Sequence, residues 1–170
     1  MKNFVFTCGD INGIGPEIVV KALNKLTSKR KDLQFTLIIP ENIFYKTFHL
    51  VKPKFKFELR ENYSVNSDSP VQVIFLNSYK QNLGKPTYAS GDAAYEALKT
   101  SFHLLKKKIA DAVITAPVSK TALKTAGIKK YPGQTEMFAD WCGIKNFVMT
   151  FLSKKLLVSL YSIHIPLKEV

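Results

Sequence analysis

Two polar segments on either side of one short expected helix could together bind an anionic small molecule. The first, Thr115-Ala-Pro-Val-Ser-Lys120, ends a short apolar strand with a hydroxyl and an ammonium group. The second, Gly133-Gln-Thr-Glu136, supplies an amide, a hydroxyl and backbone N–H groups where another helix begins. N–H groups at a helix start and neutral side-chain donors suit a phosphate. A packed core alone would not require these groups, so the two segments indicate a ligand site.

Each segment also has a structural interpretation. Lys120 could pair with an anion or help to position a proton transfer, yet a lysine on a first helical turn is more often simply solvated. Thr135 could contact a ligand, or it could be the N-cap of its helix with Glu136 as the neighbouring carboxylate. Taken one motif at a time, both alternatives stay open.

A glycine-rich turn at residues 9–15 follows an expected strand and opens a helix at Pro16, a context that favours anion or nucleotide binding. The dinucleotide pattern fails, because Ile18 stands where its third glycine belongs, and no Gly-Lys-Ser/Thr completes a P-loop. Asp10 and Glu17 would also repel a phosphate. The turn is therefore either structural or a ligand loop.

His164 is the strongest candidate metal ligand among the three histidines. We expect His49 to pack within an aromatic helix and His103 to be solvated. One histidine does not hold a metal tightly, so an incidental histidine on an edge strand is the alternative for His164. Cys8 and Cys142 have no metal-ligand spacing, and we expect both to be reduced and buried.

Strands alternate with helices along the chain, which predicts an α/β fold with a mainly parallel sheet flanked by helices. We expect strands at 3–8, 34–39, 71–76 and 112–115, a late hairpin of strands 146–152 and 156–163, and helices beginning at Pro16, at 43–50, near Ser90, at 120–125 and at 136–142. The helix near Ser90 should bury Tyr95, Leu98, Phe102 and Leu105, and 52–70 should be a surface loop or an edge hairpin. No linker divides the chain into two complete domains.

Length and composition bound the class of protein. A chain of 170 residues with 46% apolar content can form one domain with a real core. The net charge of +12 gathers at expected helix ends, where cations complement the helix dipole. It therefore favours phosphorylated metabolites over nucleic acid. No apolar run could span a bilayer and no signal peptide is visible, so we expect a cytoplasmic protein without membrane partners.

The ordered combination of motifs resembles one family, the 4-hydroxythreonine-4-phosphate dehydrogenases of pyridoxal phosphate biosynthesis. The matching segments cover nearly the whole chain: Gly9-Asp-Ile-Asn-Gly-Ile-Gly-Pro-Glu17, Gly91-Asp-Ala-Ala-Tyr-Glu-Ala-Leu98, Thr115-Ala-Pro-Val-Ser-Lys120, Ala126-Gly-Ile128, Gly133-Gln-Thr-Glu136 and His164-Ile-Pro-Leu-Lys-Glu-Val170.

This resemblance implies a fold like that of the isocitrate and isopropylmalate dehydrogenases, a homodimer, NAD or NADP, and a divalent metal such as Zn, Mg or Co. The implied reaction oxidises 4-phosphohydroxy-L-threonine by hydride transfer, and decarboxylation of the β-keto acid follows. By position, His164 matches a metal ligand, and Gln134 and Thr135 match residues that contact the substrate phosphate. Lys120 is the residue we expect to act in catalysis. The resemblance assigns no cofactor-binding residue here.

The chain departs from the family in two ways. The family has histidine where this chain has Gln134, and its members are considerably longer, with further metal ligands and basic residues beyond Val170. We therefore expect residues 1–170 to be the N-terminal part of a two-domain dehydrogenase and to be inactive alone. The alternatives are a dehydrogenase of a related phosphorylated sugar acid, which Gln134 motivates, and a non-catalytic anion-binding fragment.

Overall fold

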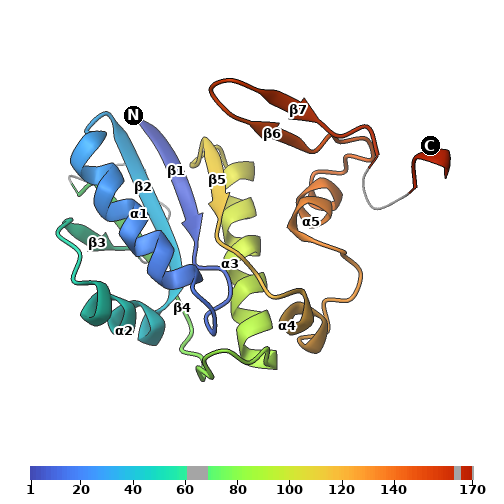
Figure 1. Ribbon diagram of the computed structural model, residues 1–170. Coiled ribbons are helices and arrows are strands. Elements are labelled where there is room, and N and C mark those ends of the chain that lie inside the picture. The colour runs from blue at the N-terminus through green and yellow to red at the C-terminus, as the bar shows by residue number, and fades with distance from the viewer. Residues whose placement is uncertain (61–68, 163–165, 170) are drawn as a thin grey trace. The chain divides into compact units, whose positions relative to one another are not determined.

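The computed structural model describes residues 1–60, 69–162 and 166–169, and the chain forms two compact units, Met1–Pro132 and Gly133–Val170. The first unit contains a sheet of five strands in the order β3-β4-β2-β1-β5 (Figure 1). Its strands are β1 (Lys2–Thr7), β2 (Leu33–Pro40), β3 (Phe57–Leu59), β4 (Val71–Leu76) and β5 (Ala112–Thr115). Every pairing is parallel, which confirms the predicted α/β class.

The edge strand β3 corrects one expectation. Residues 52–70 do not form an edge hairpin on β4, because Phe57–Leu59 runs parallel to Val71–Leu76. A parallel pair needs a crossover connection rather than a tight turn. Part of that connection, residues 61–68, lies outside the described residues.

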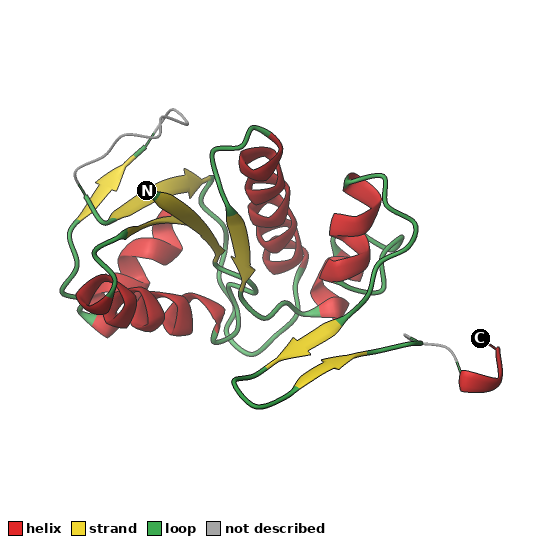
Figure 2. Ribbon diagram, turned by 90° about the horizontal axis from the view of Figure 1, so that it is seen from above, coloured by secondary structure: helices red, strands yellow, loops and turns green. Residues whose placement is uncertain are grey.

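Helices cover both faces of the sheet (Figure 2). They are α1 (Gly15–Lys29), α2 (Glu41–Val51) and α3 (Tyr88–Lys106), and the short α4 (Lys120–Thr125) packs on α3 instead. Helices α1 and α2 lie on one face, where Phe44 of α2 packs edge-on against Phe75 of β4 with ring centroids 5.3 Å apart. Helix α3 lies on the other face, against β1, β2 and β5.

The two faces of the sheet differ in chemistry because alternate side chains of a strand point to opposite sides. The face under α1 and α2 is aromatic and aliphatic, as the edge contact of Phe6 with Phe35 at 6.1 Å shows. The α3 face also carries buried polar side chains, among them Asn3 and Thr36, whose Oγ1 donates to Asn3 Oδ1 at 3.1 Å. Asn3 Nδ2 in turn donates to the carbonyl of Ile109, just after α3, at 3.1 Å.

Helix α3 begins earlier and presents a different face than its apolar residues predict. Its N-cap is Thr87, not Ser90: Thr87 Oγ1 accepts the Ser90 N–H at 3.2 Å, and Ser90 Oγ accepts the Thr87 N–H at 3.1 Å. Of the predicted stripe only Leu98 is fully buried, while Tyr95, Phe102 and Leu105 are half-buried. The buried side chains are mainly small: Ser90, Ala93, Ala94, Ala97, Leu98, Ser101 and Leu104. A small-residue face lets the helix approach its neighbours closely.

Gly91 marks the closest of these approaches. A Cβ placed on Gly91 would lie 2.0 Å from the carbonyl oxygen of Ala122 in α4, so only glycine fits. Helix α4 then ends at the predicted glycine, Gly127, which has a φ of +88°. The backbone contact between α3 and α4 fixes where α4, and with it Lys120, lies in the first unit.

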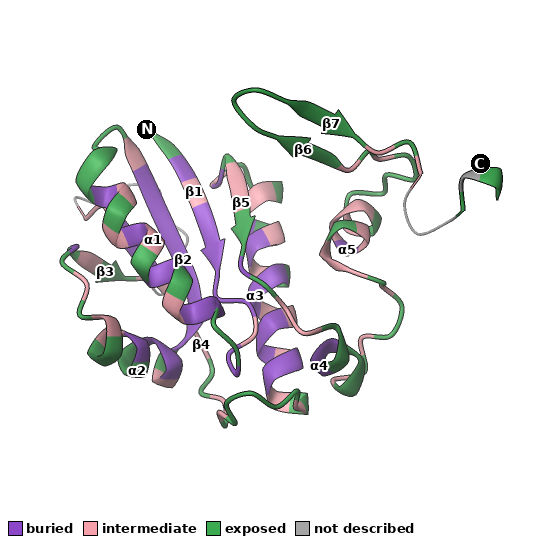
Figure 3. Cartoon of the chain, viewed as in Figure 1, coloured by how far each residue is buried: buried purple, intermediate pink, exposed green. Residues whose placement is uncertain are grey.

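The second unit contains α5 (Gln134–Trp141), the antiparallel strands β6 (Thr150–Leu152) and β7 (Leu157–Ser159), and a 3-10 turn at Leu167–Glu169. The predicted hairpin is confirmed, although its strands are shorter than expected. Ser153 Oγ organises the turn by accepting the Leu156 N–H at 3.0 Å. Both strands are exposed along their whole length (Figure 3). Among the described residues, no helix combines the length and apolarity that crossing a bilayer requires.

Replacing Gly91 by alanine should lower the free energy of unfolding by about 3 kcal/mol, because overpacking against a backbone carbonyl outweighs the better helix propensity of alanine. Urea unfolding of the two proteins measures the change. Gly13→Ala is the matched control, since its Cβ would meet its nearest neighbours at 3.6 Å, an ordinary contact. Equal losses in the two variants would contradict the close approach of α3 and α4.

Candidate functional site at the carboxyl edge of the sheet

The carboxyl ends of β1 and β5 form the topological switch point of the sheet. After β1 the chain passes through α1 to β2 on one side, and after β4 it passes through α3 to β5 on the other side of β1. The connections therefore diverge between β1 and β5. In open parallel sheets, ligands bind in the crevice that this divergence leaves at the carboxyl edge.

The loop after β1 and the segment after β5 meet at this point. The Asp10 N–H donates to the Pro117 carbonyl at 2.9 Å. Gly9 has a φ of +68°, and a Cβ there would lie 2.4 Å from the same carbonyl oxygen. A Cβ on Gly15 would lie 2.3 Å from the Cys8 carbonyl oxygen. A side chain at either position would overlap the neighbouring backbone, so both residues must be glycine.

The internal hydrogen bonds of the glycine-rich turn favour its structural interpretation. Asp10 Oδ1 accepts the Asn12 N–H at 2.9 Å, and the Asp10 carbonyl accepts the Gly13 N–H at 3.1 Å. With the Asp10 N–H already bound to Pro117, three of the turn's N–H groups are satisfied within the protein. The negative charge of the Asp10 carboxylate would also repel an anion bound at this turn. The turn therefore packs against the segment after β5 and is poorly suited to wrap a phosphate itself.

Asn12 joins this turn to a third loop, residues 77–87 between β4 and α3. Its Nδ2 donates to the Lys85 carbonyl at 2.8 Å and to Thr87 Oγ1, the N-cap of α3, at 3.0 Å. Its Oδ1 accepts the Asn82 N–H at 2.7 Å. The backbone adds a bond from the Gly84 N–H to the Asn12 carbonyl at 2.8 Å. One buried side chain thus ties the β1 loop, the β4 loop and α3 together.

The start of the third loop is held by a second amide. Asn42 of α2 exchanges two hydrogen bonds with the backbone of Tyr79, at 2.8 and 3.2 Å. The Tyr79 hydroxyl donates to Asp92 Oδ2 at 2.9 Å. Partial burial, reinforced by this carboxylate, raises the pKa of Tyr79, so the phenol stays protonated and keeps donating. Gln81 Nε2 also donates, to the Ile11 carbonyl at 2.7 Å.

The two cysteines behave differently. Cys8 is fully buried at the end of β1, as expected, and burial raises the pKa of its thiol to about 12. It is therefore an inert packing residue. Cys142 is exposed, contrary to the expectation that both are buried, because it follows the last turn of the short helix α5.

Lys120 occupies the first position of α4, beyond the carboxyl end of β5, and its side chain is exposed. The neighbouring hydroxyl is already used, since Ser119 Oγ caps α4 by accepting the Ala122 N–H at 3.1 Å. Among the described residues, Lys120 takes part in no ion pair. An anion at this edge would therefore meet the ammonium group of Lys120.

Gln134 and Thr135 are the first two residues of α5, in the second unit. Gly133 is the N-cap, which excludes the alternative in which Thr135 caps the helix. Thr135 is exposed and Gln134 is half-buried. Since Thr135 does not cap the helix, the structural alternative to ligand contact is removed for that hydroxyl.

His164 lies outside the described residues. Within the described ranges, no three His, Cys, Asp or Glu side chains gather where they could hold a metal ion. The described residues alone therefore do not fit a metal centre.

Sequence reasoning missed Asn12, Tyr79 and Gln81. The partners of Asn12 and Gln81 are some 70 residues away along the chain, so no local sequence pattern predicts these hydrogen bonds. An asparagine inside a glycine-rich turn was the one available signal, and it is ambiguous because asparagine also favours turns for local reasons.

The parallel sheet, with its switch point between β1 and β5 and the packed glycine turn after β1, defines an α/β protein of the open-sheet class. The chain belongs to a family within that class: residues 16–170 match the model of the pyridoxal phosphate biosynthetic protein PdxA.

Individual relatives agree with this assignment. The chain is 34% identical to a 4-hydroxythreonine-4-phosphate dehydrogenase of Synechocystis, covering 100% of this chain and 49% of the relative. It is 33% identical to one of Aquifex aeolicus, covering 99% and 52%. A crystal structure of a 4-hydroxythreonine-4-phosphate dehydrogenase from Burkholderia phymatum superposes with a TM-score of 0.83 at 27% identity, covering 99% of this chain and 52% of that one. The chain spans about half the length of the relatives it matches.

Replacing Asn12 by aspartate should lower the free energy of unfolding by about 2 kcal/mol, because it removes both amide donors and leaves the Lys85 carbonyl unsatisfied. Hydrogen exchange should accelerate at the Gly84 amide, which the Asn12 carbonyl holds, because the turn and the loop lose the two bonds that the Asn12 amide donates. Asn146→Asp, at an exposed position of the second unit, is the control. The same exchange rates in both variants would argue against the role of Asn12.

A thiol-specific disulfide reagent should modify one cysteine per native chain at neutral pH and two after unfolding, since Cys142 is exposed and Cys8 is buried with a pKa of about 12. The absorbance of the released thiolate counts the reactive groups. Cys142→Ser should abolish the fast reaction. Rapid modification of Cys8 in that folded variant would show that the end of β1 is open to solvent.

Proposed function

We propose that this chain supplies one part of a 4-hydroxythreonine-4-phosphate dehydrogenase, in which it forms one wall of the substrate cleft. The whole protein would oxidise 4-phosphohydroxy-L-threonine with NAD or NADP in pyridoxal phosphate biosynthesis, and decarboxylation would follow. The observation that carries this proposal is the family match over residues 16–170. The fold supports it, because ligands of open parallel sheets bind at the carboxyl edge beside such a switch point.

In this proposal three residues of the chain act on the substrate. Lys120 supplies a positive charge at the carboxyl edge, where it orients an anionic group and assists proton transfer. The Thr135 hydroxyl, which does not cap α5, donates a hydrogen bond to the phosphate. The side-chain amide of Gln134, at the start of the same helix, donates a second one. Each group is neutral or positive, as an anionic ligand requires.

The proposed enzyme also depends on a divalent metal (Zn, Mg or Co), for which His164 is the candidate ligand. Such a metal needs three or more protein ligands, and the described residues do not gather them. We therefore derive no step of the reaction through the metal. The further ligands, and the surface for a homodimer, would come from segments that correspond to the rest of the relatives' length.

A second candidate substrate is favoured by Gln134. Its neutral amide forms a weaker bond to phosphate than an imidazolium would, since charge-assisted hydrogen bonds are roughly twice as strong as neutral ones. A protein with this residue could act on a related phosphorylated sugar acid, with a hydroxyl in place of the substrate's amino group.

Calorimetry should show that the chain binds 4-phosphohydroxy-L-threonine, and Lys120→Met and Thr135→Val should each weaken binding by about tenfold, because each removes one hydrogen bond to an anion. Lys46→Met and Thr100→Val, on α2 and α3, are the matched controls. Tighter binding of the analogue with a hydroxyl for the amino group would favour the sugar-acid substrate. No binding of either ligand would contradict the proposal.

The absorbance of NADH should not rise with the 170-residue chain alone, since one wall of a cleft does not assemble a catalytic site.

The variant Gln134→His should bind 4-phosphohydroxy-L-threonine more tightly than the unchanged protein at about pH 5.5, by about tenfold, but no more tightly at about pH 8. The imidazolium that supplies the charge loses its proton near pH 6.5. Because the affinities of the two proteins are compared at the same pH, the titration of the ligand affects both equally. Gln134→Asn, which keeps a neutral amide, should show no such pH dependence. A constant ratio of affinities at both pH values would remove Gln134 from the phosphate site.

A further inference from the structure

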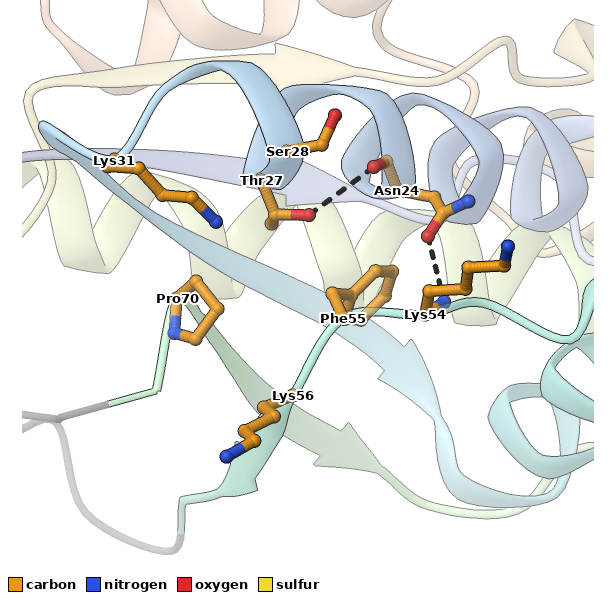
Figure 4. A pocket seen from close by; sticks show the side chains of 8 residues that line it. All are labelled: Asn24, Thr27, Ser28, Lys31, Lys54, Phe55, Lys56 and Pro70. Carbon is orange, nitrogen blue, oxygen red and sulfur yellow. Dashed lines mark hydrogen bonds between the residues drawn. The ribbon is translucent and has the colours of Figure 1, made fainter.

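The opposite edge of the sheet carries a pocket that the proposed function does not use. It has a volume of about 350 Å³ and lies between the C-terminal half of α1, the segment that leads into β3, and Pro70, which precedes β4 (Figure 4). These segments meet at the amino ends of the parallel strands. The glycine turn and Lys120 lie at the carboxyl ends, so the two places are at opposite edges of the first unit.

Specific contacts build this pocket. Asn24 Oδ1 of α1 accepts the Lys54 N–H at 2.8 Å, which holds residues 54–56 against the helix. Phe55 anchors the same segment, with its ring edge-on to Phe48 at 5.5 Å and its side chain almost wholly buried. The chain reaches this position through Lys52, whose φ of +49° ends α2 in a left-handed turn. The pocket is therefore a consequence of the fold.

The rim of the pocket is positively charged. Lys31 comes from the end of α1, and Lys54 and Lys56 flank Phe55. No ion pair joins any of these lysines to a carboxylate of a described residue. The nearby carboxylate of Asp32 is engaged by Arg30 through two hydrogen bonds of 2.9 and 2.7 Å. Arg30 thereby holds the pKa of Asp32 down at about 2, so its charge stays paired to Arg30.

The remaining lining decides what kind of anion fits. Thr27 and Ser28 each donate their hydroxyl hydrogen to a carbonyl of α1, at 2.9 and 2.8 Å, so they have no hydrogen left for an anion. Ammonium groups would therefore bind the charge. Pro70 and the small exposed edge of Phe55 form the apolar part of the lining. Figure 4 shows the Lys54 and Lys56 side chains pointing in different directions on either side of Phe55, so their ammonium groups would have to turn to share one phosphate. Lysine side chains rotate freely enough to turn onto a bound group.

We propose that this pocket binds a small phosphorylated molecule with an apolar body, its phosphate held by Lys31, Lys54 and Lys56 and its body against Phe55 and Pro70. The volume is that of a small-ligand site, since such pockets measure roughly 300–1,000 Å³. A nucleic acid would need a basic stripe that follows its backbone rather than one concave site.

Phenyl phosphate tests the proposal, with inorganic phosphate and benzyl alcohol as matched probes for its two halves. In amide NMR spectra of the 170-residue protein, phenyl phosphate should shift the signals of Asn24, Thr27 and Phe55. It should bind more tightly than inorganic phosphate, and benzyl alcohol should not bind. The dissociation constant should rise with salt, because the lysines are exposed.

The double variant Lys54→Gln/Lys56→Gln should weaken phenyl phosphate binding at least tenfold. The control Lys46→Gln/Lys107→Gln removes the same charge elsewhere and should leave the dissociation constant within a factor of two. All four lysines are exposed, so both variants should fold as the parent does. Equal affinities in the two variants, or shifts centred on residues 9–15 or Lys120, would overturn the proposal. So would a single-stranded oligonucleotide that binds more tightly than phenyl phosphate and loses affinity in the first variant.

Discussion

Close approach of backbone to backbone around the end of β1 is the constraint on which the first unit depends. At Gly9, Gly15 and Gly91 a side chain would lie within 2.4 Å of a carbonyl oxygen, so the neighbouring chain occupies the space of a missing Cβ. Interiors are packed too densely to absorb such an overlap. These contacts bring the β1 loop to the β5 loop and α3 to α4. The position of every residue at the carboxyl edge, Lys120 included, follows from them.

Much of this architecture could be predicted from local pattern. The apolar runs predicted the four longer strands, and proline and glycine predicted where α1 begins and α4 ends, because these residues restrict the backbone directly. The face of α3 could not be predicted in the same way. A stripe of large residues such as Tyr95 and Phe102 suggested one face, but a small face of alanine and serine is buried instead. Which face of a helix is buried depends on the space that its partner leaves, and that is a property of the tertiary fold.

The candidate site divides along the same line. Lys120 in the first unit, and Gln134 and Thr135 in the second, could each be singled out from sequence because each motif keeps its residues close together along the chain. The roles of Asn12 and Gln81 could not be predicted, since their partners lie some 70 residues away along the chain. The structure also decided between the two interpretations of the glycine turn: its N–H groups bond to Pro117 and Asp10, so the turn is a packing element rather than a phosphate loop. The buried thiol of Cys8, beside the turn, likewise serves in packing.

The side chain of Asn12 has a consequence for how this protein can diverge. Because it bonds to Asn82, Lys85 and Thr87 at once, the length of the loop between β4 and α3 is matched to the length of the turn after β1. An insertion in either loop would break several of these bonds together, whereas one in a free surface loop would break none. During evolution the two loops should therefore change in length together or not at all.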